Sequence, residues 1–306
     1  MLKRPRGALL TSALVLLALI GCGPQVTSPS PAPSPAGGPP SPSVGADHPP
    51  ACLGIGQRWV SPSDNATLVC VPAASFQMGA ADDDPAARPD SKPRHLVRVS
   101  GFWIDRTEVT NADWQRCVDA EVCRAPSTVP GSTTTASKTH PDYYHDPAFA
   151  DYPVLIYTPE ESEAYCTCMK RRLPTEAEFE LAAGGTDGRR YPWGDVLDCD
   201  HASYLGCTTD TTDVETPPAG ASPYGALNMA GNVWEWVADR YSADYYAESP
   251  VQDPTGPAAG ANHSRRGGGF SSLPRQLVVT VRANGDPVHY FDGQMGFRSA
   301  ASPGAP

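Results

Sequence analysis

The pattern of apolar and polar positions predicts a few short, well-separated elements. β-Branched and aromatic residues alternate with polar ones over 96–104, which predicts a strand, and Thr67-Leu68-Val69 predicts another. Three helices are expected where a threonine N-cap precedes an acidic first turn: 111–119 after Thr110, a helix from Pro159 after Thr158, and 176–183 after Thr175. The rest is mostly turns with scattered aromatic residues. This pattern predicts an α+β fold with little regular secondary structure.

The first apolar run has a different meaning. Lys3, Arg4 and Arg6 precede the apolar stretch 8–20, which ends at Gly21-Cys22. A basic start, a short apolar run and a small residue before the cleavage point are typical of a secretory signal peptide, here 1–21. Leu19-Ile20-Gly21-Cys22 looks like a bacterial lipobox, which predicts lipidation of Cys22. The alternative is an ordinary secretory signal in which Cys22 is incidental.

Residues 22–50 change character, because ten of the 28 residues from Gly23 to Pro50 are proline and five are serine. Such a stretch cannot form a core and behaves as a semi-rigid, disordered spacer. The predicted folded domain is 51–306, with its core over 70–300. The expected location is exported and lipid-anchored, at the outer membrane facing the periplasm or the cell surface, with the membrane as partner through the anchor.

With Cys22 assigned to lipid, eight cysteines remain in a chain expected to be exported, which favours disulfides. Cys166 and Cys168 are too close on a helix to bridge each other. Either they stay reduced or one of the local pairings is wrong, and a metal site is the competing interpretation. Local spacing favours three bridges: Cys52–Cys70, Cys117–Cys123 and Cys199–Cys207.

The formal net charge of −11 argues against nucleic acid as a partner, since an acidic body repels phosphate backbones. Two acidic clusters, Asp82-Asp83-Asp84 and Asp210 with Asp213, have the oxygen chemistry for divalent cations. Solvated acidic loops are the simpler interpretation, which we favour.

Eight ordered motifs together resemble the formylglycine-generating enzyme (sulfatase-modifying factor) family over about Cys70 to Ala300. That resemblance implies a variant of the C-type lectin fold. The motifs are Phe76-Gln-Met-Gly, Phe102-Trp-Ile-Asp-Arg-Thr-Glu-Val-Thr-Asn, Pro153-Val, Arg172-Leu-Pro-Thr-Glu-Ala-Glu-Phe-Glu, Tyr191-Pro-Trp-Gly-Asp, Asn228-Met-Ala-Gly-Asn-Val-Trp-Glu-Trp, Arg266-Gly-Gly-Gly-Phe and Met295-Gly-Phe-Arg298.

Most of these motifs are expected to be structural. Their tryptophans supply buried area, and Gly267, Gly268, Gly269 and Gly296 are expected at close backbone approaches or positive φ. Arg172 and Arg298 are expected to hold loops through charge-assisted hydrogen bonds.

The resemblance implies a calcium site in the loop 228–235. Asn228 and Glu235 would give side-chain oxygens, and Gly231 and Val233 backbone carbonyls. The alternative is that Asn228 caps a turn and Glu235 pairs with an arginine. A second family site falls near Ser203, where asparagine is usual.

Formylglycine generation oxidises a substrate cysteine with copper(I) held between two enzyme cysteines. The resemblance places those positions at Ser272 and Leu277, and no cysteine follows Cys207. Because copper(I) needs soft thiolate ligands, copper is not expected, and formylglycine-generating activity is predicted to be absent.

Other chemistry has weaker support. The segment with Ser272 and Leu277 at the two cysteine positions, called the degenerate segment below, is flanked by His263, Asp286, His289 and Asp292. These are the residue types of a two-histidine, one-carboxylate iron site, although loop residues are the simpler interpretation. Ser271 or Ser272 beside a histidine would be a nucleophile–base pair, but no spacing supports it.

Three functions follow from this pattern. The favoured one is a non-catalytic binding module that presents its groove to an envelope peptide, protein or glycan. An accessory subunit of an envelope system is the second. The alternative in a different class is a divergent metal-dependent oxidase, or another enzyme of the same superfamily, in the cell envelope.

Overall fold

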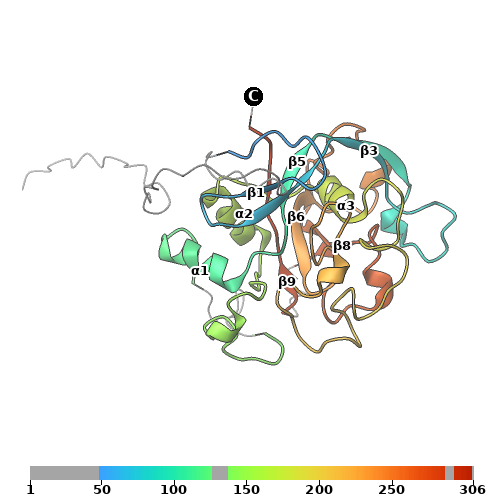
Figure 1. The fold of residues 1–306 in the computed structure, drawn as a ribbon. Helices are drawn as coiled ribbons and strands as arrows, with labels where there is room; N and C mark the ends of the chain where they lie inside the picture. The colour runs from blue at the N-terminus through green and yellow to red at the C-terminus, as the bar shows by residue number, and fades with distance from the viewer. Residues whose placement is uncertain (1–47, 126–136, 287–292, 305–306) are drawn as a thin grey trace, which may run out of the picture.

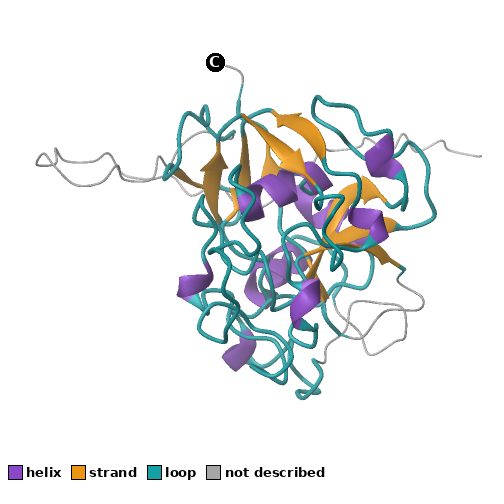
Figure 2. Ribbon diagram, turned by 90° about the vertical axis from the view of Figure 1, so that its right-hand side faces the viewer, coloured by secondary structure: helices purple, strands orange, loops and turns teal. Residues whose placement is uncertain are grey.

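A computed structural model of the chain describes residues 48–125, 137–286 and 293–304 (Figure 1). Within these residues, three short α-helices lie among ten short strands. Loops make up most of the described head (Figure 2). The fold is α+β with little regular secondary structure, as predicted. None of the described helices combines the length and the apolar character needed to cross a bilayer.

The α-helices begin where the threonine caps predict. They are α1 (Asn111–Asp119), α2 (Pro159–Cys168) and α3 (Glu176–Gly184). Thr110 and Thr175 each form a capping box with the acidic residue three positions on, so two otherwise unpaired N–H groups are satisfied at each start. Gly185, at φ 65°, ends α3. Short 3₁₀ helices are η1 (Pro89–Ser91), η2 (Pro147–Phe149), η3 (Pro218–Gly220), η4 (Tyr245–Ala247) and η5 (Pro274–Gln276).

The described strands form three small sheets. The first, in the order β1-β2-β5-β10, is antiparallel and contains β1 (Arg58–Val60), β2 (Thr67–Val71), β5 (Phe102–Asp105) and β10 (Ala300–Ala301). The second pairs β3 (Ala74–Met78) with β4 (His95–Val99). The third has the order β8-β7-β6-β9 and contains β6 (Trp234–Arg240), β7 (His263–Arg266), β8 (Arg282–Gly285) and β9 (Met295–Gly296), with β6 and β9 parallel.

The single strand predicted over 96–104 is two strands that belong to different sheets. Its first part is β4, which pairs with β3, and its second part is β5, which pairs with β2 and β10. The chain turns at Ser100-Gly101, where a side chain on Gly101 would lie 3.3 Å from the backbone nitrogen of Ala73. Both strands contribute to the same core, but the core-facing positions change from Val97 and Val99 to Phe102 and Ile104, so the alternation shifts by one residue at this turn.

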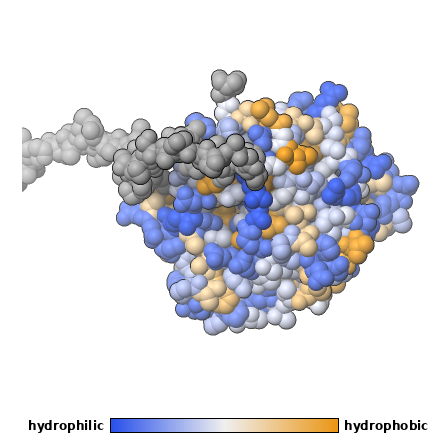
Figure 3. Space-filling view, viewed as in Figure 1, coloured by the Kyte–Doolittle hydropathy of each residue, from blue (hydrophilic) through white to orange (hydrophobic). Residues whose placement is uncertain are grey.

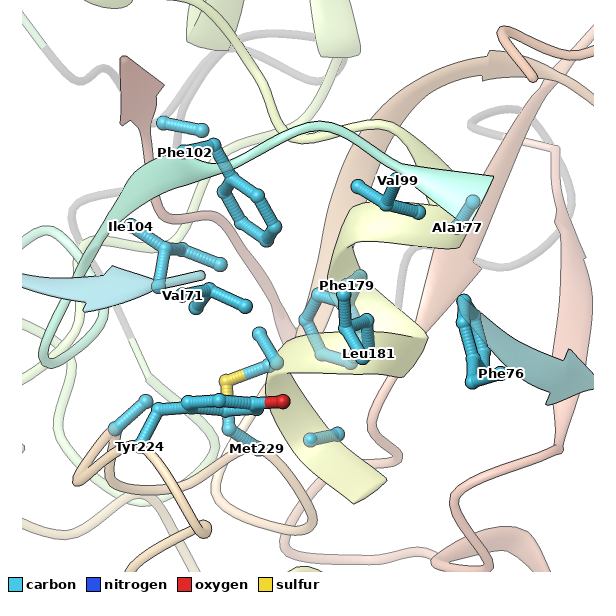
Figure 4. Packing of buried hydrophobic residues seen from close by; sticks show 14 of the residues in the cluster. Val71, Phe76, Val99, Phe102, Ile104, Ala177, Phe179, Leu181, Tyr224 and Met229 are labelled. Atoms are coloured by element: carbon cyan, nitrogen blue, oxygen red, sulfur yellow. The ribbon is translucent and has the colours of Figure 1, made fainter. Parts of the chain in front are cut away.

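That core surrounds α3, all nine residues of which are buried. Figure 4 shows Phe179 and Leu181 of α3 among residues from β2, β4 and β5, including Val71, Val99 and Phe102. A helix buried on all sides must pair its polar groups internally. Its three glutamates do so, and two of them organise the site described below.

Three disulfides join pairs of described cysteines in this loop-rich head: Cys52–Cys70, Cys117–Cys123 and Cys199–Cys207. These are the three bridges that local spacing favours. Cys166 is a free, buried thiol, whereas Cys168 is not free. Both alternatives left open for this pair are therefore wrong: the three local bridges all form, and Cys168 is disulfide-bonded, so only Cys166 of the two is reduced.

The two ends of the described head meet. The N–H of Gly304 donates to the carbonyl of Pro49 at 2.8 Å, and the indole of Trp103 donates to the carbonyl of Pro50 at 2.8 Å. On the face shown in Figure 3, hydrophobic residues lie in small separate groups among hydrophilic ones.

Candidate functional site

The degenerate positions lie on the connection between β7 and β8. After β7, Gly267 and Gly268 adopt φ of 90° and 76°, a left-handed conformation that glycine accepts at no steric cost. Gly269 lies at a close approach, where a Cβ would be 3.0 Å from the Gln294 side-chain oxygen, and one on Gly296 would be 2.8 Å from the side chain of Val233. The expected roles of these glycines are therefore confirmed.

Both ends of this connection are fixed to α3 by buried ion pairs. Arg266, the last residue of β7, donates to Glu180 at 2.5 Å and to Glu176 at 3.2 Å. Arg282, the first residue of β8, donates twice to Glu176, at 2.8 and 2.7 Å. Burial alone would raise the pKa of Glu176, but Arg282 and Arg266 outweigh it and hold that pKa below its ordinary value. The carboxylate therefore stays charged and clamps the segment.

Between these anchors, Ser272 closes a tight turn. Its hydroxyl oxygen accepts from the N–H of Gly269 at 2.9 Å, and its own N–H donates to the Gly269 carbonyl at 2.8 Å. The Ser272 carbonyl accepts from the N–H of Leu205 at 3.1 Å. At 4% exposure, this serine is a buried structural hydroxyl. It hydrogen-bonds no histidine among the described residues, so the structure gives no support to a serine–histidine pair.

Leu277 fills the second position with hydrocarbon. It is 1% exposed and belongs to a cluster of buried apolar residues with Tyr191, Ala202 and Ala230. The rings of Trp193, Tyr204 and the side chains of Leu197 and Val278 complete that cluster. A hydroxyl that already accepts a hydrogen bond and a packed alkyl group do not fit copper(I), which requires soft sulfur ligands.

The loop predicted to bind calcium is organised by a third glutamate. Glu108 is buried and accepts from the side-chain amides of Asn228 and Asn232, each at 3.1 Å. Asn228 also donates to the Val214 carbonyl at 3.0 Å. The amide nitrogens thus tie the loop to residues far away in sequence. Among the described residues, no group of three or more histidine, cysteine, aspartate or glutamate side chains could hold a metal ion.

Glu235 is occupied by Arg298. Its two oxygens accept from Nε and Nη2 of Arg298 at 2.7 and 2.8 Å, and both side chains are fully buried. Arg298 also donates to the carbonyls of Asp105 and Leu227, at 3.2 and 2.9 Å. The predicted loop-holding role of Arg298 is confirmed. The assignment of Glu235 as a calcium donor does not fit this geometry, because both of its oxygens already face a guanidinium.

The other predicted donors have their own roles in the fold. Gly231, at φ 103°, lies so close to Ser203 that a Cβ would be 2.6 Å from the Ser203 carbonyl oxygen. Val233 is fully buried in an apolar cluster with Tyr143 and Leu155. The hydroxyl of Ser203 lies 2.9 Å from that of Thr212.

Of the four residues considered for an iron site, the structure describes two, His263 and Asp286. His263 is buried in β7, with Nδ1 3.2 Å from the carbonyl of Val237. Asp286 follows β8, while His289 and Asp292 lie outside the described residues.

Arg172 behaves as predicted. It forms two hydrogen bonds of 2.6 Å with Glu178 and one of 3.1 Å with the Leu173 carbonyl, at the start of α3.

These features define a loop-rich α+β domain with the scaffold of a sulfatase-modifying factor and no thiol pair at its centre. The chain belongs to that family: the model of the sulfatase-modifying factor enzyme 1-like domain matches residues 58–303.

Three comparisons illustrate the range of this family. The formylglycine-generating enzyme of Streptomyces coelicolor is 33% identical over 85% of this chain and 95% of its own length. The hercynine oxygenase of Mycobacterium tuberculosis is 35% identical over 51% of this chain and 42% of that enzyme. The structure of PvdO from Pseudomonas aeruginosa superposes with a TM-score of 0.67 and 26% identity, over 81% of this chain and 98% of that one.

Sequence reasoning missed the roles of Glu108, Glu176 and Glu180. A signal was present for the last two, because glutamates four residues apart lie on the same face of a helix. Arginines at both ends of the glycine-rich connection would have been their partners.

Proposed function

We propose that this protein is an exported, lipid-anchored member of the family that has lost the copper-thiolate oxidase and acts as a binding module for an envelope peptide, protein or glycan. One observation carries the proposal: the two positions that align with the catalytic cysteines are a hydrogen-bonded buried serine and a packed leucine. Since the ion pairs that hold this segment to α3 are present, the segment can fold stably without the two cysteines that copper-dependent oxidation requires.

The absence of oxidation is tested with the full-length protein, copper(I) and a cysteine-containing sulfatase peptide, with the Streptomyces coelicolor enzyme as positive control. We expect the peptide to keep its thiol, measured by mass spectrometry. Conversion of that thiol to an aldehyde would refute the proposal.

The anchor is tested separately with Cys22→Ser. We expect the wild-type protein to fractionate with membranes and the variant to be released, because one lost lipidation site removes the acyl chains. Membrane association that survives the substitution would contradict lipidation at Cys22.

Calcium enters this proposal only as a weak ligand. Because Arg298 takes both oxygens of Glu235, calcium would have to bind through Asn228 and the carbonyls of Gly231 and Val233, a set with no formal charge. We expect millimolar calcium to leave the melting temperature unchanged. A clear rise would show that calcium binds the folded protein and would contradict this expectation.

A further inference from the structure

A second feature lies beside the degenerate segment: an open cleft with a volume of about 350 Å³. It lies between the turn after β3, the end of α3 at Gly184 with the glycine-rich loop 185–190 that follows, and residues 278–280 of the β7–β8 connection. It is therefore separate from the packed position of Leu277, although Val278 contributes to both surroundings. This cleft does not depend on whether the chain is catalytic.

Three arginines line this cleft in a protein whose net charge is −11: Arg94, Arg189 and Arg190. Arg189 is already paired, since it donates to both oxygens of Asp187, at 2.9 and 2.6 Å. Arg94 makes no side-chain hydrogen bond or ion pair with any residue that the structure describes, and it is exposed. It is a free guanidinium at the cleft.

Arg190 is held in place but keeps donors free. Its N–H donates to Asp195 at 3.1 Å, and its carbonyl accepts from Val279 at 2.9 Å, so the backbone is fixed from both sides. Nε donates to the hydroxyl of Tyr191 at 3.3 Å, and the guanidinium lies 5.8 Å from the centre of that ring. Its two terminal nitrogens bond no residue in the described part of the chain.

The acids of the cleft do not cancel these two charges. Glu180 is directed into the core, where it accepts from the N–H of Gly79 at 2.7 Å and from Arg266. Asp187 is taken by Arg189. Asp84 remains, with one oxygen accepting from the N–H of Ala86 at 2.8 Å. Arg94 and the two free terminal nitrogens of Arg190 therefore share the cleft lining with one carboxylate that no arginine pairs, Asp84.

We propose that this cleft binds an oxyanionic group, a phosphate, sulfate or carboxylate carried by a small ligand, through Arg94 and Arg190. Guanidinium groups present paired N–H donors that match the oxygens of such anions, and the hydrogen bonds are charge-assisted. The volume admits the anion together with a small part of the molecule that carries it. Asp84 at the rim opposes the anion and limits its affinity.

The test is isothermal titration of the full-length protein, in detergent at low salt, with inorganic phosphate, inorganic sulfate and acetate as separate probes. We expect at least one probe to bind, and Arg94→Gln and Arg190→Gln each to weaken it by about fivefold or more. Asp84→Asn should tighten binding about twofold, because it removes the opposing charge. The three arms show which oxyanion the cleft prefers.

The matched control is Arg98→Gln, an exposed arginine on β4 outside the cleft. It should bind like the wild type, and the urea midpoints of all variants should agree, which shows that the head is folded. Failure of all three probes to bind, or equal losses in the Arg98 and Arg94 variants, would overturn the proposal. Neither result bears on the oxidase assay above.

Discussion

The segment from Arg266 to Arg282 has buried charges at its two ends, whereas the charge between them, Arg275, is exposed. At the ends, fully buried arginines meet glutamates of α3 at 2.5–3.2 Å. In the middle, Ser272 and Leu277 are equally buried but carry no charge. The ends determine where the chain runs, whereas the middle determines what chemistry is available there. The path of this segment therefore does not depend on which side chains stand at positions 272 and 277.

The strongest way to break this comparison is at the ends, with Glu176→Gln. It leaves Arg282 and part of Arg266 as uncompensated buried charges, so we expect a loss of about 3–5 kcal/mol in the free energy of unfolding. Urea unfolding followed by tryptophan fluorescence measures it. The control is Glu215→Gln, which removes the more exposed Arg106–Glu215 pair and should cost less than about 1 kcal/mol. If Glu176→Gln costs as little as Glu215→Gln, the buried ion pairs do not stabilise the fold as proposed.

The middle is tested next, with Leu277→Ala. If this side chain is part of a packed cluster, its truncation leaves a cavity and should cost about 2–4 kcal/mol. The control is Leu205→Ala. Leu205 follows Tyr204 of that cluster in the sequence but is exposed, so its truncation should cost far less. An unchanged urea midpoint for Leu277→Ala would mean that the position is open instead of packed.

Asp105 is a buried acid that shares its one arginine partner, Arg171, with a second acid, whereas Glu176 pairs with two arginines. Burial raises the pKa of Asp105 to about 6. The charge of Arg171 opposes this rise, but Arg171 also pairs with Asp64, whose negative charge raises the pKa of Asp105 further. The unfolded value is about 3.9, so the folded state holds the proton more tightly. This contribution, on the order of 3 kcal/mol, is present below about pH 4 and is lost as the pH rises through about 6.

The measurement is the free energy of unfolding between pH 4 and pH 7, for the wild type and for Asp105→Asn. The variant is less stable overall because Arg171 loses a partner, but its stability should decline less over this range. Parallel pH profiles for the two proteins would show that Asp105 does not titrate there.

The smallest effect is expected for Ser272→Ala, which leaves the N–H of Gly269 without its acceptor. The cost should be about 1–2 kcal/mol. Ser271→Ala serves as the control, since the Ser271 backbone N–H donates to Gln294 and its hydroxyl bonds no other residue that the structure describes. If both substitutions are neutral, the turn does not depend on this hydroxyl.

Local features of the fold were predictable from the sequence. The caps at Thr110 and Thr175 act over three residues, so the starts of α1 and α3 can be read directly. The strand break at Gly101 was missed, because period-two alternation does not show which sheet each half joins.

The candidate site was only partly predictable. Its missing sulfur is a property of composition and needs no coordinates. The partner of Glu235 lies 63 residues away, and that of Arg282 lies 106 residues away, so only the three-dimensional arrangement reveals that these charges are already paired. The resemblance of the loop 228–235 to a calcium site therefore gave calcium as the expected partner of Glu235, whereas the structure pairs it with Arg298.

The bond between Cys52 and Cys70 has a mechanical consequence. Any tension applied through the N-terminal segment reaches the head at residues 49–52, where hydrogen bonds to Gly304 and Trp103 are the first to bear it. Beyond them the disulfide carries the load straight to β2, which lies between β1 and β5, so residues 53–69 remain slack. Stretching the protein would therefore have to shear β2 from its neighbours, and residues 53–69 cannot extend while the disulfide that closes them into a loop is intact.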